Sequence, residues 1–211
     1  MENYLDCKKN IDLDKLKEIS KIIKNGGIVV FPTETVYGIG TNGLNKESIS
    51  RLYEVKQRPI NKPISLLVSS IEMAETIAKD ITDMEYKLME KFFPGPLTII
   101  LKKKTIVPDN LTNNNDTVGI RMPDNIIAKK LIEYSNVPIA TPSANISGKP
   151  SGTDINTIMN DFKDKVDYYI DGGKSKLGIG STIVKLENGY PVILREGSIS
   201  KKQILECLNL M

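Results

Sequence analysis

The amino-acid sequence predicts a single α+β domain in which a twisted sheet of parallel and antiparallel strands is flanked by helices. The chain has 211 residues, 40% of them hydrophobic and 26% charged, which is typical of one globular domain with a buried core. Short apolar runs alternate with amphipathic segments, which indicates interspersed strands and helices. Two further runs flank Glu187-Asn188-Gly189, a hairpin signal, so the sheet is expected to be mixed rather than purely parallel.

The strands are expected in the apolar, β-branched runs between turn signals. They cover residues 28–31, 64–68, 97–101, 117–121, 137–141, 167–170, 181–186 and 190–195. The helices are expected where apolar residues recur every three or four positions. They cover residues 12–25, 46–56, 125–134, 156–162 and 201–208, with two more between the second and third strands. Residues 102–116, which contain a lysine triplet and three consecutive asparagines, are expected to form an exposed loop.

Capping-box spacings predict where the two additional helices begin. In such a box, an N-terminal Ser or Thr is followed three residues later by Glu or Gln. Ser69 with Glu72 opens one helix, and Thr82 with Glu85 opens the next. The helix before them cannot continue past Pro59, because proline lacks the N–H that a helix interior requires.

The chain contains no histidine, and this absence excludes several mechanisms. There can be no Ser-His-Asp triad, no Cys-His pair and no zinc site with a histidine ligand. Proton transfer near neutral pH must use a carboxylate, a lysine, a tyrosine, the substrate or water.

Charge and cysteine content indicate a cytoplasmic protein. The net charge of +3 permits contact with RNA but does not by itself argue for it. Cys7 and Cys207 are expected to be free thiols in a reducing compartment, with a disulfide between them as the alternative. The chain starts without the apolar segment of a signal peptide, and no apolar run approaches the roughly 18 residues of a membrane span.

The four arginines stand out among 25 lysines. Where lysine is the usual surface cation, an arginine is more often selected for its planar, bidentate donor group. Arg51 lies in the middle of a predicted helix, and Arg58 follows the end of that helix. Arg121 and Arg195 each end an apolar strand, where they could bind a carboxylate or phosphate. The alternative is an ordinary ion pair with a glutamate such as Glu196.

A basic, proline-stiffened segment contains Lys56, Arg58 and Lys62. Pro59 disfavours a helical conformation for the residue before it, so the segment is expected to be extended. Side chains alternate along an extended chain, and Lys56 and Arg58 would then point the same way. Two cations on one side suit a polyphosphate or carboxylates. The alternative is a solvated basic turn.

Two pairs of polar residues have the same spacing of two. Ser143 and Asn145 follow a predicted strand and would offer a hydroxyl and an amide to one side, unless they only cap a turn. Thr33 and Thr35 would also point together, with Glu34 facing the other way. Threonine is common in strands, so this pair has a structural alternative as well.

A glycine-rich segment before the hairpin could bind an anion through backbone N–H groups, or could be a flexible turn. It contains Gly178, Gly180, Ser181 and Thr182. The sequence has neither the GxxxxGK[ST] motif of a P-loop nor the GxGxxG motif of a dinucleotide-binding strand–helix turn. A bound nucleotide would therefore be held by another arrangement.

Taken in chain order, these segments resemble the threonylcarbamoyl-AMP synthases, a family built on the YrdC-like domain. The matching motifs are Pro32-Thr-Glu-Thr-Val-Tyr-Gly-Ile-Gly40, Lys56-x-Arg58 with Lys62-Pro63, Pro94-Gly-Pro-Leu-Thr98, Arg121-Met-Pro123, Pro142-Ser-Ala-Asn-x-Ser-Gly148, Gly180-Ser-Thr-Ile-Val184 and Arg195-Glu-Gly197. The resemblance covers residues 12–200. It implies a YrdC/RibB-like fold with a concave, basic cleft, and a chain of the short type in which residues 1–211 form one domain.

The resemblance also implies an activity and its partners. Such nucleotidyltransferases convert ATP, L-threonine and bicarbonate or CO2 into threonylcarbamoyl-AMP and pyrophosphate. Partner transferases then deliver the threonylcarbamoyl group to adenosine 37 of tRNA. Mg²⁺ would accompany ATP without a dedicated protein cage, since magnesium is commonly held by phosphates and water. A weak contact with tRNA or other RNA is left open, and no membrane partner is expected.

Site residues follow from the matching motifs. The ATP-binding residues implied are Lys56, Arg58, Lys62, Thr117, Ser143, Asn145, Ser151 and Arg195, of which Lys56, Arg58, Ser143 and Asn145 are also the candidate catalytic residues. The threonine-binding residues implied are Thr35, Arg121, Thr141 and Ser181. Many long members of the family carry a histidine near the substrate in the strand after Lys-Pro, where this chain has Ile64-Ser-Leu-Leu-Val68.

Two other functions are kept as alternatives. One is a carbamoyl transferase domain that uses carbamoyl phosphate and ATP. The other is an RNA-binding or ribosome-maturation protein, which would bind RNA with a steep salt dependence and would not turn over nucleotide.

Overall fold

Ten strands form one mixed sheet in the computed structural model, which describes residues 3–211. The strands are β1 (Tyr4–Asp6), β2 (Val29–Phe31), β3 (Gly38–Asn42), β4 (Leu66–Leu67), β5 (Leu97–Lys102), β6 (Thr117–Arg121), β7 (Ile139–Ala140), β8 (Tyr168–Asp171), β9 (Thr182–Glu187) and β10 (Tyr190–Arg195). Their order across the sheet is β1-β8-β2-β3-β7-β4-β6-β5-β9-β10. β8 pairs in parallel with β1 and β2, whereas β9 and β10 form the predicted antiparallel hairpin. The predicted mixed sheet is confirmed.

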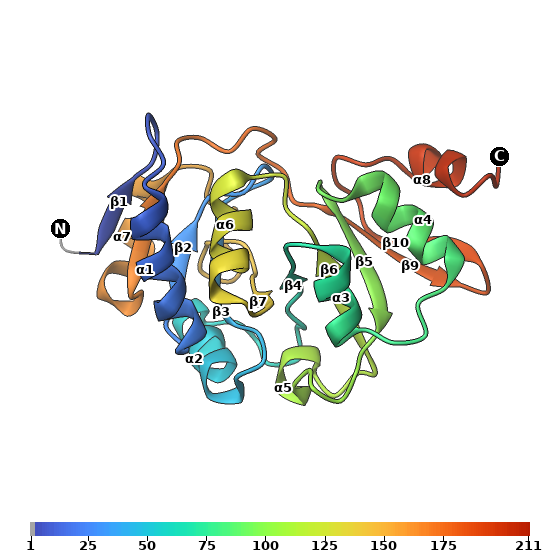
Figure 1. The fold of residues 1–211 in the computed structure, drawn as a ribbon, viewed down its shortest axis with the longest axis horizontal. Coiled ribbons are helices and arrows are strands. Elements are labelled where there is room, and N and C mark those ends of the chain that lie inside the picture. Colours follow the sequence, from blue (N-terminus) through green and yellow to red (C-terminus); the bar gives the residue numbers. More distant parts are fainter. Residues whose placement is uncertain (1–2) are drawn as a thin grey trace.

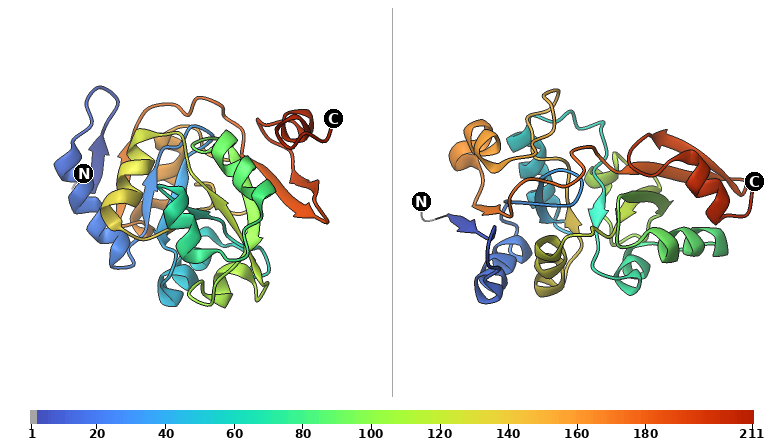
Figure 2. Two further views of the ribbon diagram at one scale, coloured as in Figure 1. Left: turned by 45° about the vertical axis from the view of Figure 1, so that its right-hand side comes forward. Right: turned by 90° about the horizontal axis from the view of Figure 1, so that it is seen from above.

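Helices cover both faces of this sheet (Figures 1 and 2). They are α1 (Leu13–Lys24), α2 (Lys46–Lys56), α3 (Ile71–Ile77), α4 (Asp83–Phe92), α5 (Asp109–Thr112), α6 (Ile126–Ser135), α7 (Ile155–Phe162) and α8 (Lys201–Cys207), with a short 3₁₀ turn at Lys163–Lys165. Seen from above, α1, α6, α3 and α4 lie on one face, and α2 and α7 on the other (Figure 2, right). Within residues 3–211, no helix is long and apolar enough to cross a bilayer.

Most helix ends follow from local capping. Asp12 accepts a hydrogen bond from the backbone of Lys15 and starts α1, and Thr82 with Glu85 forms the predicted capping box of α4. The prediction for α3 was wrong by one residue. Its cap is Ser70, which accepts a hydrogen bond from the Met73 backbone.

The predicted exposed loop over residues 102–116 is partly wrong. It contains the short helix α5, and Val107, Leu111 and Thr112 are buried. The many polar residues around these three buried side chains left no apolar pattern that could predict the helix. β3 was also missed, because glycine is rare in strands. Here a Cβ on Gly40 would lie 2.7 Å from the Ile139 side chain and 2.9 Å from Phe31, so only glycine lets the neighbouring strands approach.

Arg51 ties α2 to the sheet. Its guanidinium binds both carboxylate oxygens of Asp167, at 2.7 and 3.2 Å. Asp167 also accepts a hydrogen bond from the Ile28 backbone just before β2. The arginine outside the family motifs thus has a structural partner.

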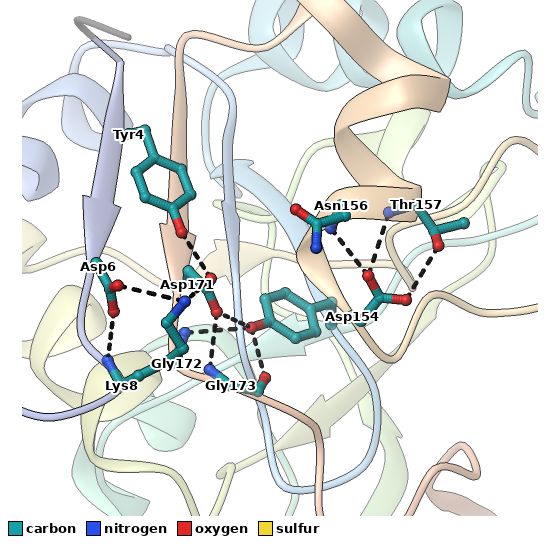
Figure 3. A network of polar contacts seen from close by, with 10 residues as sticks. Tyr4, Asp6, Lys8, Asp154, Asn156, Thr157, Asp171, Gly172 and Gly173 are labelled. Carbon is teal, nitrogen blue, oxygen red and sulfur yellow. Dashed lines mark hydrogen bonds and ion pairs between the residues drawn. The ribbon is translucent and has the colours of Figure 1, made fainter.

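Asp171, at the end of β8, joins the N-terminal segment to Tyr37, which lies between β2 and β3 (Figure 3). Its carboxylate accepts a 2.6 Å hydrogen bond from the Tyr4 hydroxyl and lies 3.0 Å from the Lys8 ammonium. The Gly173 backbone donates to it at 2.9 Å, and the Tyr37 hydroxyl lies 3.4 Å away. Burial raises the pKa of Asp171, but these hydrogen bonds and Lys8 outweigh burial and hold it below its usual value.

Asp171→Ala should lower the free energy of unfolding by about 2 kcal/mol at pH 7, since it leaves the partly buried Tyr4 hydroxyl and Gly173 N–H without their acceptor. A carboxyl group with a lowered pKa in the folded state contributes stability above its unfolded pKa of ~3.9, and this is lost as pH falls through the folded pKa. Urea unfolding should therefore show the difference at pH 7 and a smaller one near pH 3. The exposed neighbour variant Asp6→Ala should change stability by less than about 0.5 kcal/mol. A pH-independent loss in Asp171→Ala would contradict the expectation.

Candidate functional site

A cavity of about 170 Å³ opens where several strands of the sheet end. Its lining comes from nine stretches of the chain, which the sheet order brings together. They contribute Thr35, Val36, Arg58, Pro63, Ile64, Ser65, Leu67, Thr98, Arg121, Thr141, Pro142, Ser143, Ser151, Gly180, Ser181, Ile183 and Arg195. Three of these side chains are arginines, and none of the described lining residues is acidic.

The structure brings eight of the twelve candidate residues to this cavity. They are Thr35, Arg58, Arg121, Thr141, Ser143, Ser151, Ser181 and Arg195. Leu67, from the predicted strand that follows Lys62-Pro63, also lines it. Thr98 and Ser65 line it too, although sequence reasoning had not selected them.

Arg121 and Glu34 form a buried ion pair beside the cavity. The Arg121 guanidinium lies 2.7 Å from Glu34 Oε2, and the two side chains are 9% and 6% exposed. The ion pair foreseen as an alternative for Arg121 therefore exists, but its partner is Glu34 and not Glu196. Within the described part of the chain, neither Glu34 carboxylate oxygen receives a well-directed hydrogen bond. Arg121 is thus the cation that compensates Glu34 among the described residues.

Thr33 and Thr35 point together, as the spacing predicted. Their hydroxyl oxygens lie 2.9 Å apart. The Thr33 hydroxyl donates to the Val36 carbonyl at 2.6 Å, which fixes the turn after β2. Thr35 is therefore held in place where it lines the cavity.

Arg195 orients Ser181, and within residues 3–211 it forms no ion pair with a glutamate. Its guanidinium donates to the Ser181 carbonyl at 2.8 and 3.0 Å and to the Ser181 hydroxyl at 3.0 Å. The Thr98 hydroxyl lies 2.7 Å from the same hydroxyl, so Ser181 is held from two sides. Burial, followed by the positive charges of Arg121 and Arg58, lowers the pKa of Arg195. An anion bound between the three groups would relieve this mutual repulsion.

The backbone N–H groups of the glycine-rich segment are only partly available to an anion. The N–H of Gly178 donates to the Thr35 carbonyl at 2.9 Å, and the N–H of Thr182 donates to Pro96 at 3.0 Å. The segment thus serves to place Ser181 against the cavity.

Arg58 lies on the cavity wall and braces its own loop. Its guanidinium donates to the carbonyls of Lys62 and Pro63 at 3.0 and 2.8 Å. The side chain of Lys62 is exposed and does not line the cavity. Burial lowers the pKa of Arg58 despite an opposing effect of Tyr53.

The prediction that Lys56 and Arg58 point the same way from an extended chain was wrong. Lys56 is the last residue of α2, and Gln57 caps the helix with a left-handed φ of 51°. Lys56 is 1% exposed, and its Nζ donates to the carbonyls of Ser143 and Asn145, both at 2.5 Å. It therefore fixes the loop after β7 through these two hydrogen bonds, and it does not line the cavity.

Asn145 and Thr117 also lie outside the lining. The Asn145 amide donates to the carbonyls of Ile146 and Lys149, and its oxygen accepts from the Ser143 hydroxyl at 2.5 Å. It thus shapes the loop that presents Ser143. Thr117 starts β6, four residues before Arg121, opposite Lys102 of β5. A direct contact of either residue with ATP stays a prediction.

Burial, followed by the positive charge of Arg58, lowers the pKa of Lys56 from 10.5 to about 7. Below pH 7 both folded and unfolded chains carry this proton. Between pH 7 and 10.5 only the unfolded chain does, so the folded state gains stability as pH rises, by up to ~1.4 kcal/mol per unit. From pH 7 to 8.5, urea unfolding should show a gain of about 1–2 kcal/mol relative to Lys56→Met. If the stabilities of the wild-type protein and Lys56→Met depend equally on pH, the pKa of Lys56 is not lowered.

Three arginines around a cavity at strand ends are typical of a domain that binds an anionic ligand. Residues 21–197 match the Sua5_yciO_yrdC family model, which is described as telomere recombination, and the chain belongs to this family.

Sequence and structure comparisons agree on this family. The chain is 42% identical over 204 residues to "Threonylcarbamoyl-AMP synthase" of Pyrococcus abyssi, a match that covers 97% of this chain and 60% of the relative. It is 43% identical over 192 residues to "Putative threonylcarbamoyl-AMP synthase" of Methanocaldococcus jannaschii, covering 91% and 90%. The crystal structure of P. abyssi Sua5 complexed with L-threonine superimposes with a TM-score of 0.94 at 41% identity, covering 97% and 60%. The chain thus spans about 60% of the length of the P. abyssi relative.

Proposed function

We propose that this protein is an ATP-dependent threonylcarbamoyl-AMP synthase. The proposal rests on the lining of the cavity, which combines three arginines with Ser and Thr residues of the family motifs. The arginines are Arg58, Arg121 and Arg195, and the Ser and Thr residues are Thr35, Thr98, Ser143 and Ser181. The names of the P. abyssi and M. jannaschii relatives support the same activity. The substrates would be ATP, L-threonine and bicarbonate or CO2.

The chemistry suits a site without histidine. The triphosphate, the threonine carboxylate, bicarbonate and the carbamate are all anions. The uncharged threonine amine attacks CO2 and gives up one proton to a substrate group or water, which forms the carbamate. An oxygen of the carbamate then attacks the α-phosphorus, and pyrophosphate leaves. Catalysis of such a transfer depends mainly on positioning and on neutralising charge. Arginines and hydroxyls supply both.

The geometry suggests how the substrates divide the cavity. Arg121, with Thr35, Thr141 and Ser181, would bind threonine and its carboxylate. On the remaining wall, the ATP phosphates would contact a second group, namely Arg58, Ser143, Ser151 and Arg195. Lys56 and Asn145 would act by holding the loop that presents Ser143.

Magnesium would enter as part of the nucleotide substrate. Residues 3–211 contain no group of three or more His, Cys, Asp or Glu side chains that could hold a metal ion. The ion would therefore be bound by phosphate and water. We further propose a cytoplasmic location, and delivery of the product to adenosine 37 of tRNA by partner transferases.

The decisive experiment incubates the purified protein with ATP, Mg²⁺, L-threonine and bicarbonate, and follows pyrophosphate together with the AMP-linked product by mass spectrometry. Release of pyrophosphate should require threonine. Arg58→Ala should reduce the rate at least ~100-fold, since an electrostatic contact to the reacting phosphates is typically worth 10²–10³. Arg51→Ala removes an arginine from the same helix region but outside the cavity, and should stay active. A requirement for carbamoyl phosphate in place of threonine would contradict the proposal.

A further inference from the structure

The side-chain amine of Lys56 has two hydrogen-bond acceptors, which matches the two N–H groups of an uncharged amine. A neutral amine has two N–H donors, whereas an ammonium has three. The Nζ of Lys56 donates to two backbone carbonyls, those of Ser143 and Asn145. Within the described residues, Nζ has no third acceptor and no carboxylate partner. The geometry therefore satisfies the neutral form and leaves one proton of the charged form unpaired.

The charged groups around Lys56 also favour the neutral form. Arg58, two residues on, is the charge that acts on it, and that charge is positive. In the facing loop, the ammonium of Lys149 is 2.6 Å from Asp161, so that carboxylate is already paired. Tyr53, one turn back along α2, donates to the Lys62 carbonyl instead. An unpaired buried ammonium is costly, and burial alone lowers its pKa.

An anion in the cavity would reverse this balance. Ser143 lines the cavity, and its backbone carbonyl is 2.5 Å from Nζ. Only Ser143 would then separate a phosphate bound at this residue from Nζ of Lys56. A negative charge at such range shifts the pKa of a neighbouring group toward the charged form by about 1–3 units.

This inference rests on the proposed function. We propose that at pH 8 Lys56 is uncharged in the unliganded protein and takes up a proton when ATP binds. The protonated amine would keep both carbonyl bonds and direct its third N–H toward the phosphates. Lys56 would then be a positioning residue whose charge appears only with the nucleotide.

Calorimetry in buffers of different ionisation enthalpy measures this proton directly. MgATP is titrated into the protein at pH 8 without threonine, so that no turnover occurs and the nucleotide phosphates, with a second pKa near ~6, are already ionised. We expect uptake of about 0.5–1 proton per bound MgATP at pH 8 and a much smaller uptake at pH 6, where Lys56 is already charged. ¹³C NMR of labelled lysine side chains should show the Lys56 titration midpoint rising by at least about one unit with MgATP.

Lys46→Met is the matched control, because Lys46 is exposed at the other end of α2, about 15 Å away along the helix. This variant should keep the proton uptake, whereas Lys56→Met should lose it. If Lys56→Met does not fold or bind, the inference is tested by the proton uptake of the wild-type protein, compared between pH 8 and pH 6. MgATP binding without proton uptake at pH 8 would overturn this inference and leave the proposed activity intact. Proton-linked binding without threonine-dependent pyrophosphate would instead contradict the proposed function alone.

Discussion

Replacing Arg121 by alanine should lower the free energy of unfolding by about 3–5 kcal/mol and abolish threonine-dependent pyrophosphate release. The stability loss follows because Glu34, 6% exposed and 2.7 Å from Arg121, would be left as an uncompensated buried charge. The loss of activity follows because Arg121 lines the part of the cavity that we assign to threonine. Chemical unfolding and the pyrophosphate assay measure the two effects separately.

A double variant separates stability from function. Glu34→Gln combined with Arg121→Met removes both charges, and replacing a buried ion pair in this way is often neutral for stability. We expect the double variant to recover most of the lost free energy of unfolding but none of the activity. Recovery of activity together with stability would mean that Arg121 supports the fold only.

Gly197→Ala should reduce the rate of adenylate formation by at least ~100-fold, because a displacement of about 1 Å at a site can cost this much. A Cβ at Gly197 would collide with the backbone of Gly180 and Thr182 and lie 2.6 Å from the carbonyl carbon of Ser181. Backbone cannot move aside as a side chain does, so Ser181 would be displaced from the cavity wall. Steady-state kinetics with threonine and ATP varied in turn would measure the change.

Gly178→Ala is the matched control for this steric argument. Gly178 lies in the same segment with a φ of +69°, but the nearest atom to an added Cβ is 4.0 Å away. Its substitution should cost about 1–2 kcal/mol of stability through left-handed backbone strain and leave the cavity in place. Equal losses of activity in the two variants would show that the segment responds to strain and not to the collision at Ser181.

Hydrophobic periodicity and capping predicted most of the fold. The helix over 46–56 and the strand over 117–121 appear with the expected bounds, because each carries its own apolar pattern and its own end signals. β3 could not be predicted in this way. Its glycines are there for the close approach of Phe31 and Ile139, and that contact exists only in the assembled sheet.

The lining of the cavity was predictable to the level of motifs, but the contacts within it were not. The spacing of Thr33 and Thr35 correctly placed their hydroxyls together, since the relevant geometry is local. The partners of Arg121 and Lys56 lie 87 and 87–89 residues away in the chain, and only the tertiary fold pairs them. Thr98 belonged to a matching motif, but its contact with Ser181 required β5 and β9 to be neighbours.

The cavity also constrains when the protein becomes able to bind a ligand during its synthesis. Its walls combine Thr35, near the start of the chain, with Arg195, 160 residues later. Contacts between such distant residues form late, because a long loop must close before they contribute free energy. A nascent chain emerging from the ribosome can bury much of its hydrophobic core early, yet its site stays open until the β9–β10 hairpin has been made. Nucleotide binding should therefore report on completion of folding rather than on its first steps.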